Sequence, residues 1–244
     1  MSMQELKQMI AGAGRIVAFT GAGISAESGI PTYRGSDGVW NKYDPNKYAN
    51  VNYFFQDPSY YWNFFKEARY SVLKAAEPNA GHKALARLEH AGRLAAVITQ
   101  NIDGLHQAAG CKNVLELHGN TRTIGCLDCG TDYGIDAVYE QLETELPPKC
   151  RQCGGTLKPR VVMFGESLPV DILERATEES GRCDLFISVG SSLVVQPAAS
   201  MPAIAKRAGA SLVIVNQDPT PLDDRADLVI RESASSVLSG AVAQ

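Results

Sequence analysis

Apolar runs alternate with amphipathic stretches along most of the chain, and this alternation predicts strands and helices in turn. Alternating strands and helices predict an α/β fold in which helices cover both faces of a parallel sheet. Runs typical of buried strands lie at 15–20, 94–100, 113–119, 159–165, 184–190, 211–217 and 227–231. Helical patterns lie at 3–13, 57–76, 79–92, 169–180 and 197–209, and a short helix is expected near the end.

Two segments do not follow the alternation. Residues 37–79 are rich in aromatic side chains and predict a helical module, while residues 122–159 contain four of the six cysteines. Both segments leave the α/β domain and return to it, so we expect them to build one small domain. The large domain would then comprise residues 1–36, 80–121 and 160–244. A cleft between two such lobes is a usual place for a ligand.

Composition narrows the class of protein without changing the predicted fold. Hydrophobic residues make up 45% of the 244 residues and charged residues 20%, ordinary values for a globular chain with a buried core. The formal net charge of −4 argues against direct nucleic-acid binding, which usually needs a basic face. The N-terminal residues lack an apolar signal core, and no apolar run approaches the roughly 18 residues of a membrane span. We therefore expect a cytoplasmic protein with no membrane partner, and its oligomeric state is left open.

Four cysteines form two Cys-x-x-Cys pairs separated by 20 residues. That spacing is at the upper end of the zinc-ribbon range, and a glycine beside each pair allows a tight turn around an ion. Four thiolates fill a tetrahedral Zn²⁺ shell and leave no open position, so the predicted site is structural. Two disulfides, free thiols or an iron–sulfur cluster are the alternatives. The predicted zinc ligands are Cys126, Cys129, Cys150 and Cys153.

The segment GAGISAESGIPTYRG, residues 21–35, begins like a dinucleotide-binding turn and then departs from it. A dehydrogenase would continue with an unbroken helix and a second strand that ends in an acidic residue roughly 20 positions on. Here Gly29 and Pro31 interrupt the helix, and Arg34 follows as a cation suited to a phosphate. We expect a phosphate-binding start followed by a loop that folds over a nucleotide, although the glycines alone also fit a simple tight turn. The positions that match the G-x-G-x-x-G/A spacing are Gly21, Gly23 and Ala26.

Polar residues follow several predicted strands, and the carboxyl ends of parallel strands form the edge where open α/β folds bind ligands. Gln100, Asn101 and Asp103 follow one strand. Asp103 also fits the N-cap of the next helix, on which His106 is expected to face outward. His118 ends another strand, where it could accept a proton near neutral pH, although a lone histidine there is more often structural. Other strands end in Gly190, Ser191 and Ser192, in Asn216 and Gln217, and in Phe164, Gly165 and Glu166.

Together these segments resemble the sirtuin family of NAD-dependent protein deacylases, with a prokaryotic-type catalytic core. The resemblance runs from about residue 5 to the end, and the ordered set of segments is specific although no single one is. It implies a Rossmann-type large domain, and a small domain made of a four-cysteine zinc ribbon and a helical module. NAD and acyl-lysine would bind in the cleft between them. The segments are GAGISAESGIPTYRG, TQNIDGLH, LHGN, the paired Cys-x-x-Cys, FGE, GSSLVVQPAA and VNQDPTP.

The resemblance also implies roles for individual residues. His118 would be the general base, and Asn101 and Asp103 would favour a strained cofactor geometry. The stretch with Val162, Phe164 and Gly165 resembles the strand that binds substrate peptide by β-augmentation. The implied NAD-binding set is Gly21, Ala22, Gly23, Ala26, Tyr33, Arg34, Gln100, Asn101, Ile102, Asp103, His118, Gly190, Ser191, Ser192, Asn216, Gln217 and Ala234.

The implied reaction is deacetylation of protein lysine, which consumes NAD and gives nicotinamide, O-acetyl-ADP-ribose and free lysine. Acetyl-lysine proteins or peptides are the implied partners, and Zn²⁺ is the implied structural metal. Three alternatives remain. The same site could remove succinyl or longer acyl groups, or it could transfer ADP-ribose to protein. As a non-enzyme, the chain could be a zinc-ribbon binding module with a degenerate NAD pocket.

Some positions depart from the family pattern. Tyr33 stands where the family commonly has Phe, so a ring is kept. Members that prefer succinyl or malonyl groups carry a Tyr-x-x-Arg pair. The matching stretch here has Phe65 with Ala68, or Lys66 with Arg69 after a shift of one residue. Because a buried acyl carboxylate needs a placed cation, we expect acetyl groups to be preferred over dicarboxylic ones.

Overall fold

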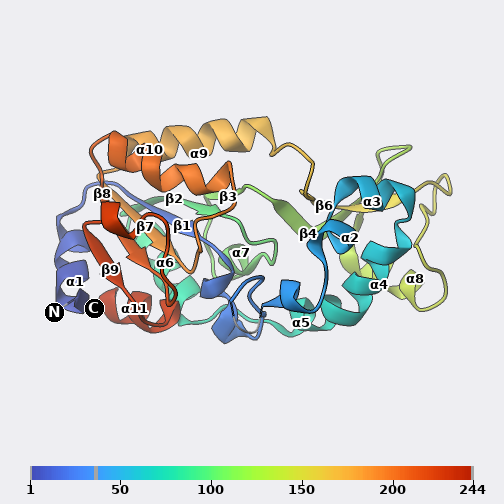
Figure 1. Cartoon of the computed structure of the whole chain (residues 1–244), viewed down its shortest axis with the longest axis horizontal. Coiled ribbons are helices and arrows are strands. Elements are labelled where there is room, and N and C mark those ends of the chain that lie inside the picture. Colours follow the sequence, from blue (N-terminus) through green and yellow to red (C-terminus); the bar gives the residue numbers. More distant parts are fainter. Residues whose placement is uncertain (1, 36–37, 243–244) are drawn as a thin grey trace.

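A computed structural model describes residues 2–35 and 38–242, which form a large and a small lobe (Figure 1). The large lobe holds a six-stranded sheet, and the small lobe holds a three-stranded sheet. The domain boundary expected between residues 36 and 37 lies outside the described residues.

Every neighbouring pair of strands in the large sheet is parallel, and the order is β3-β2-β1-β7-β8-β9. β1 lies inside this sheet, and all five of its residues are buried. The strand order reverses between β1 and β7, so a crevice suited to ligands forms at the carboxyl ends of these two strands. The strands are β1 Ile16–Thr20, β2 Leu94–Thr99, β3 Val114–Glu116, β7 Leu185–Val189, β8 Ser211–Val215 and β9 Leu228–Ile230.

Helices cover both faces of this sheet, as the alternation of apolar runs predicts (Figure 1). Ile16 and Ala18 of β1 belong to the core under α1, α6 and α11, whereas Val17 and Phe19 belong to the core under α9 and α10. Successive side chains of a strand point to opposite faces, so β1 contributes to both cores. Asn79 caps α6 as expected, because its side chain accepts hydrogen bonds from two backbone N–H groups of the first turn. The helices of this lobe are α1 Ser2–Gly12, α6 Ala80–His90, α7 Leu105–Ala108, α9 Val170–Arg182, α10 Met201–Arg207 and α11 Ala234–Ala241.

The small lobe is built on an antiparallel sheet with the order β5-β4-β6. Trp62 and Phe65 pack in its core with Ile124 of β4, and all three side chains are buried. Aromatic residues of the helical module thus cover the sheet that carries the cysteines. The elements are β4 Gly119–Cys126, β5 Asp132–Gly134, β6 Leu157–Val161, α2 Pro45–Tyr48, α3 Val51–Gln56, α4 Ser59–Ala68, α5 Tyr70–Ala75 and α8 Ile135–Leu142.

Two elements differ from the sequence prediction. The helical stretch expected over 57–76 is two helices, because the backbone at Arg69 leaves helical geometry with φ −123° and ψ −52°. The strand expected over 159–165 ends at Val161 and pairs antiparallel with β4 instead of joining the parallel sheet. β6 is an edge strand there, which suits Pro159 because proline cannot donate a ladder hydrogen bond.

Short 3₁₀ turns take the place of longer helices in several connections, and two of them follow β1 directly. They lie at Ala22–Ile24, Ala26–Ser28, Val39–Asn41, Ala198–Ser200 and Asp223–Arg225. Within 2–35 and 38–242, none of the helices combines the length and the apolar character that crossing a membrane requires.

Candidate active site

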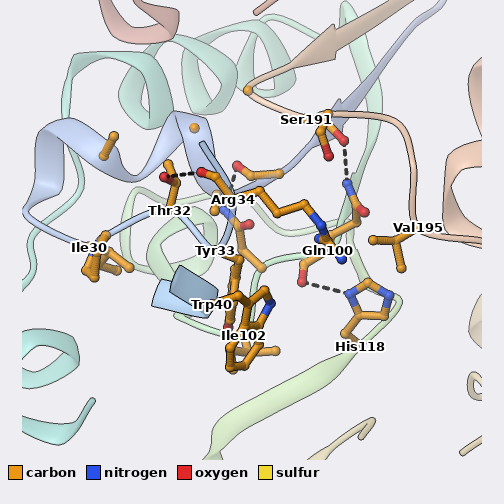
Figure 2. A pocket seen from close by; sticks show the side chains of 18 of the residues that line it. Ile30, Thr32, Tyr33, Arg34, Trp40, Gln100, Ile102, His118, Ser191 and Val195 are labelled. Carbon is orange, nitrogen blue, oxygen red and sulfur yellow. Dashed lines mark hydrogen bonds between the residues drawn. The ribbon is translucent and has the colours of Figure 1, made fainter. Parts of the chain in front are cut away.

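A cavity of about 1100 Å³ lies at the carboxyl ends of the parallel strands and is lined by both lobes. The large lobe contributes the segment after β1 and the ends of β2, β7 and β8, and the small lobe contributes aromatic residues of α4. Figure 2 shows Tyr33, Gln100 and His118 gathered at this cavity from three separate segments. Of the NAD- and peptide-binding residues expected from the sequence, all line the cavity except Asp103.

The segment after β1 approaches the end of β7 closely. The Gly21 N–H donates to the Val189 carbonyl, and the Gly23 N–H donates to the Gly190 carbonyl. A Cβ at Gly21 would lie 2.7 Å from the Gly190 oxygen, and one at Gly23 would lie 2.6 Å from the Gly190 Cα. Glycine is therefore required at both positions by packing of one strand end on the other. The two 3₁₀ turns that follow replace the long helix of a hydride-transfer site, as the sequence indicates.

The residues after β2 form a hydrogen-bonded floor for the cavity. The Gln100 side chain donates to Ser191 Oγ at 2.7 Å, which joins two strand ends (Figure 2). Asn101 Nδ2 is 3.1 Å from both the Gly21 carbonyl and Ser25 Oγ. Asp103 lies behind the residues that line the cavity, where its carboxylate accepts a hydrogen bond from Ser25 Oγ at 2.8 Å.

Asp103 is neither a lining residue of the cavity nor the N-cap of α7, which is Gly104, but its carboxylate contacts the elements on both sides. One carboxylate oxygen accepts from the Leu105 N–H at the start of α7, and the other accepts from Ser25. Burial raises the pKa of Asp103, and these hydrogen bonds oppose that rise. Its contact with Asn101 therefore passes through the Ser25 hydroxyl and not through the cavity.

His118 is placed to accept a proton. Its Nδ1 is 3.0 Å from the Gln100 carbonyl oxygen, which can only accept, so Nδ1 carries the hydrogen (Figure 2). Nε2 then has a lone pair and no partner among the described residues, in a ring that lines the cavity. Burial lowers the pKa of His118, with the Gln100 carbonyl opposing the change, so the ring is neutral near pH 7.

His106 does not face outward, and that expectation is wrong. Its side chain is 1% exposed, its Nε2 lies 2.9 Å from Thr20 Oγ1, and its ring lies 4.9 Å from the ring of His82. α7 has only four residues, too few for a pattern of polar positions to reveal which face is buried. The hydroxyl of Thr20 makes burial of this polar ring possible.

An aromatic part of the cavity was not anticipated residue by residue. The Tyr33 ring lies 5.2 Å from the Trp40 ring, and Trp40 in turn lies 6.2 Å from Phe64. Arg69 projects into this group, with its guanidinium carbon 4.3 Å from the centre of the Tyr33 ring. Only the aromatic density of residues 37–79 indicated such a group, and it did not indicate which side chains point inward. Tyr61 completes the lining beside Arg69.

The four cysteines of the Cys-x-x-Cys pairs are positioned to hold a zinc ion. Their sulfur atoms all lie within 4.8 Å of one another, and none is in a disulfide. The Cys126–Cys153 and Cys129–Cys150 sulfur atoms are 3.6 Å apart, close to the ~3.8 Å edge of a tetrahedron with Zn–S bonds of about 2.3 Å. Four protein ligands leave no open position, so zinc here would stabilise the small lobe and take no part in a reaction.

The fold and the site define an α/β protein with a nucleotide-type crevice and a structural four-cysteine module. The sequence model of the Sir2 family matches residues 21–197, and the chain belongs to this family. It is 49% identical over 237 residues to NAD-dependent protein deacylase 2 of Archaeoglobus fulgidus, covering 97% of this chain and 93% of that protein. It is 50% identical over 223 residues to an NAD-dependent protein deacetylase of Caldivirga maquilingensis, covering 91% and 85%. A solved Sir2 structure with a deacetylated p53 peptide and 3′-O-acetyl ADP-ribose matches with a TM-score of 0.94 at 42% identity, covering 98% of this chain and 97% of that one.

Proposed function

We propose that this protein is an NAD-dependent protein-lysine deacetylase that consumes NAD and releases nicotinamide, O-acetyl-ADP-ribose and free lysine. Family membership and the names of its relatives support the reaction. The observation that carries the proposal is the neutral His118, whose Nε2 lone pair is unpaired in the wall of the interlobe cavity. A general base needs this combination of protonation state and access.

Separate residues of the chain would bind NAD, orient its ribose and accept a proton. The segment 21–35 and the ends of β7 and β8 would hold NAD, which on binding supplies a ribose carbon for attack by the acyl oxygen as nicotinamide leaves. Asn101 would orient the ribose from its bonds to Gly21 and Ser25, and Asp103 would fix Ser25 from behind. His118 would take a proton from a ribose hydroxyl at Nε2, while its Nδ1–H stays on the Gln100 carbonyl.

The acyl-lysine peptide would lie along residues 162–165. The Val162 N–H already donates to the His118 carbonyl, which holds this stretch against the proposed base. The backbone of Phe164 is paired with Ala49 and Val51, so a peptide strand would bond to the backbone of Val162 and Gly165. Phe164 would contribute its ring, which is 39% exposed. We also propose a cytoplasmic location, supported by thiols that surround a metal position instead of forming disulfides.

Replacement of His118 tests the reaction. We expect His118→Ala to lower deacetylation of an acetyl-lysine peptide at least ~100-fold, because general-base catalysis typically contributes that much. Nicotinamide release and peptide mass are measured together, and NAD binding by calorimetry shows that the site is intact. Full activity in the variant would contradict the role of His118. ADP-ribose attached to protein by the wild type, without deacylated peptide, would favour transferase activity instead.

A second substrate class is favoured by one observation, the placement of Arg69. Its side chain is 6% exposed and lines the cavity, where its guanidinium stacks on Tyr33 and lies 5.4 Å from the Phe64 ring centre. No carboxylate of the described residues lies within salt-bridge distance of it. The expectation against dicarboxylic acyl groups rests on the need for a placed cation, and Arg69 is a cation in the wall of the cavity. A buried guanidinium favours an anionic partner, so acyl groups that end in a carboxylate are a second candidate substrate.

Arg69→Met tests this second candidate. We expect kcat/KM for a succinyl-lysine peptide to fall at least ~10-fold, the loss of one charge-assisted hydrogen bond, while that for the acetyl peptide changes little. Arg182→Met is the matched control, because Arg182 lies on α9 in an exposed pair with Glu178. Equal losses of kcat/KM for both peptides, or no succinyl removal by the wild type, would contradict this second candidate and leave the deacetylase proposal unaffected.

A further inference from the structure

Two buried histidines face each other behind the cavity floor. His82 on α6 is 0% exposed and His106 on α7 is 1% exposed, and their rings are 4.9 Å apart at 62°. In each ring Nε2 has a hydroxyl neighbour, whereas Nδ1 is buried and has no partner within residues 2–35 and 38–242. Neither ring lines the cavity, so neither can touch substrate directly.

The hydroxyl groups beside these rings lead to the loop that carries Asn101. Thr20 Oγ1 is 2.9 Å from His106 Nε2 and 2.8 Å from Thr99 Oγ1. Thr99 Oγ1 also accepts from the backbone N–H of Asn101 at 3.0 Å. On the other side, Ser25 joins His82 to the Asn101 side chain. All these hydroxyl groups are buried, so water does not compete for them.

Two proton arrangements satisfy the contacts of the His106 relay. In one, His106 donates from Nε2 to Thr20 and Thr20 donates to Thr99. In the other, Thr99 donates to Thr20, Thr20 donates to Nε2, and the imidazole hydrogen on Nδ1 has no acceptor among the described residues. Both arrangements join His106 Nε2 to Thr99 through the Thr20 hydroxyl. Burial lowers the pKa of His106 to about 3, so the ring in this relay is neutral.

We propose that His106 is a positioning residue for the reaction, which hydrogen-bonds through Nε2 to the Thr20–Thr99 relay and so fixes the backbone of Asn101 at the cavity floor. The inference rests on the proposed function for the role of Asn101. Because Asn101 then holds Gly21 and Ser25 through its side chain, a shift of its backbone misaligns the segment after β1 that is proposed to hold NAD. The acyl-peptide end, at residues 162–165, is attached to His118 and the small lobe instead.

The test compares two replacements of one ring. His106→Gln keeps an amide that can donate or accept near the position of Nε2, whereas His106→Leu has similar bulk and no hydrogen-bonding group. For His106→Leu we expect KM for NAD to rise at least tenfold, with the Kd of the acetyl-lysine peptide changed less than twofold. For His106→Gln we expect a KM for NAD within about threefold of wild type. His90→Leu, an exposed histidine on the same helix as His82, is the control and keeps wild-type constants.

A double-mutant cycle with Thr20→Val keeps the test decisive if His106→Leu folds poorly. Thr20→Val removes the relay hydroxyl with little change of shape, so its effect and that of His106→Leu should not add. Unchanged KM for NAD in His106→Leu, equal damage in His106→Gln, or additive effects in the cycle would each overturn the proposal. Calorimetry with NAD alone separates it from the proposed function. If the wild type binds NAD but removes no acyl group, and only His106→Leu weakens that binding, the deacetylase proposal is contradicted and the positioning role of His106 is supported.

Discussion

At the scale of single residues, the buried histidine pair links the stability of the fold to pH. Burial lowers the pKa of His82 to about 4, and burial together with His82 lowers that of His106 to about 3. In the unfolded chain both would titrate near 6.5. The unfolded state therefore binds more protons than the folded state below pH 6.5. The contribution of the two neutral histidines to the free energy of unfolding is complete above that pH and is lost as the pH falls. The raised pKa of Asp103 acts in the opposite direction and offsets part of the loss.

Chemical denaturation at pH 7.5 and pH 5 measures this linkage. We expect the pair to lower the free energy of unfolding at pH 5 by about 2 kcal/mol for each histidine, at ~1.4 kcal/mol per pH unit below 6.5. His106→Gln removes one of the two contributions. Between pH 7.5 and pH 5 the free energy of unfolding of this variant should therefore fall less than that of wild type, by about the contribution of one histidine. His90→Gln, at an exposed position, should lose as much as wild type. Equal losses in wild type and His106→Gln would show that His106 is not held neutral.

The residue scale is also where sequence reasoning about the site reached its limit. His118, Asn101 and Gln100 could be proposed because each follows a predicted strand and resembles a family motif. The burial of His106 could not be predicted. It depends on the relay of Thr20 and Thr99, whose hydroxyl groups are 79 positions apart in sequence. The inward position of Arg69 could not be predicted, because the break between α4 and α5 has no proline or glycine to mark it.

At the scale of elements, β4 connects the proposed base to the metal position. It begins at Gly119, directly after His118, and ends at Cys126, a predicted zinc ligand. Its antiparallel partner β6 leads from the cysteine turns to residues 162–165. We therefore expect order in the cysteine turns to support the proposed base and the proposed peptide stretch through these two paired strands.

Zinc removal tests this connection. We expect a chelator strong enough to strip zinc to abolish deacetylation and to make residues 122–159 sensitive to protease, because structural zinc contributes directly to folding. Zinc content, activity and cleavage sites are measured on the same sample, and added zinc should restore all three. Cys126→Ala should behave like the stripped protein, whereas Cys111→Ala, a buried cysteine outside the cluster, should keep its zinc. Full activity with zinc absent would contradict the role of β4 and β6.

At the scale of the whole molecule, the cavity exists because the sheet and the small lobe bring together segments from residue 21 to residue 234. The strand order reverses between β1 and β7, so their following loops separate and leave room for a ligand. The small lobe closes one side of that crevice with aromatic residues of α4. The large lobe by itself lacks the aromatic residues of α4 that complete the lining of the cavity.

The sequence by itself determined the features that follow from local patterns. Apolar runs with helical stretches between them define the parallel sheet and its covering helices, two Cys-x-x-Cys pairs define the cysteine cluster, and strand-end motifs supply residues that line the cavity. The tertiary structure decided the features that depend on distant partners. It placed β6 in the small sheet, turned His106 inward to Thr20, moved Asp103 behind the cavity and brought Arg69 over Tyr33. The physical reason is that a side chain's burial and protonation are set by the groups packed around it, and those groups come from elements far away in the sequence.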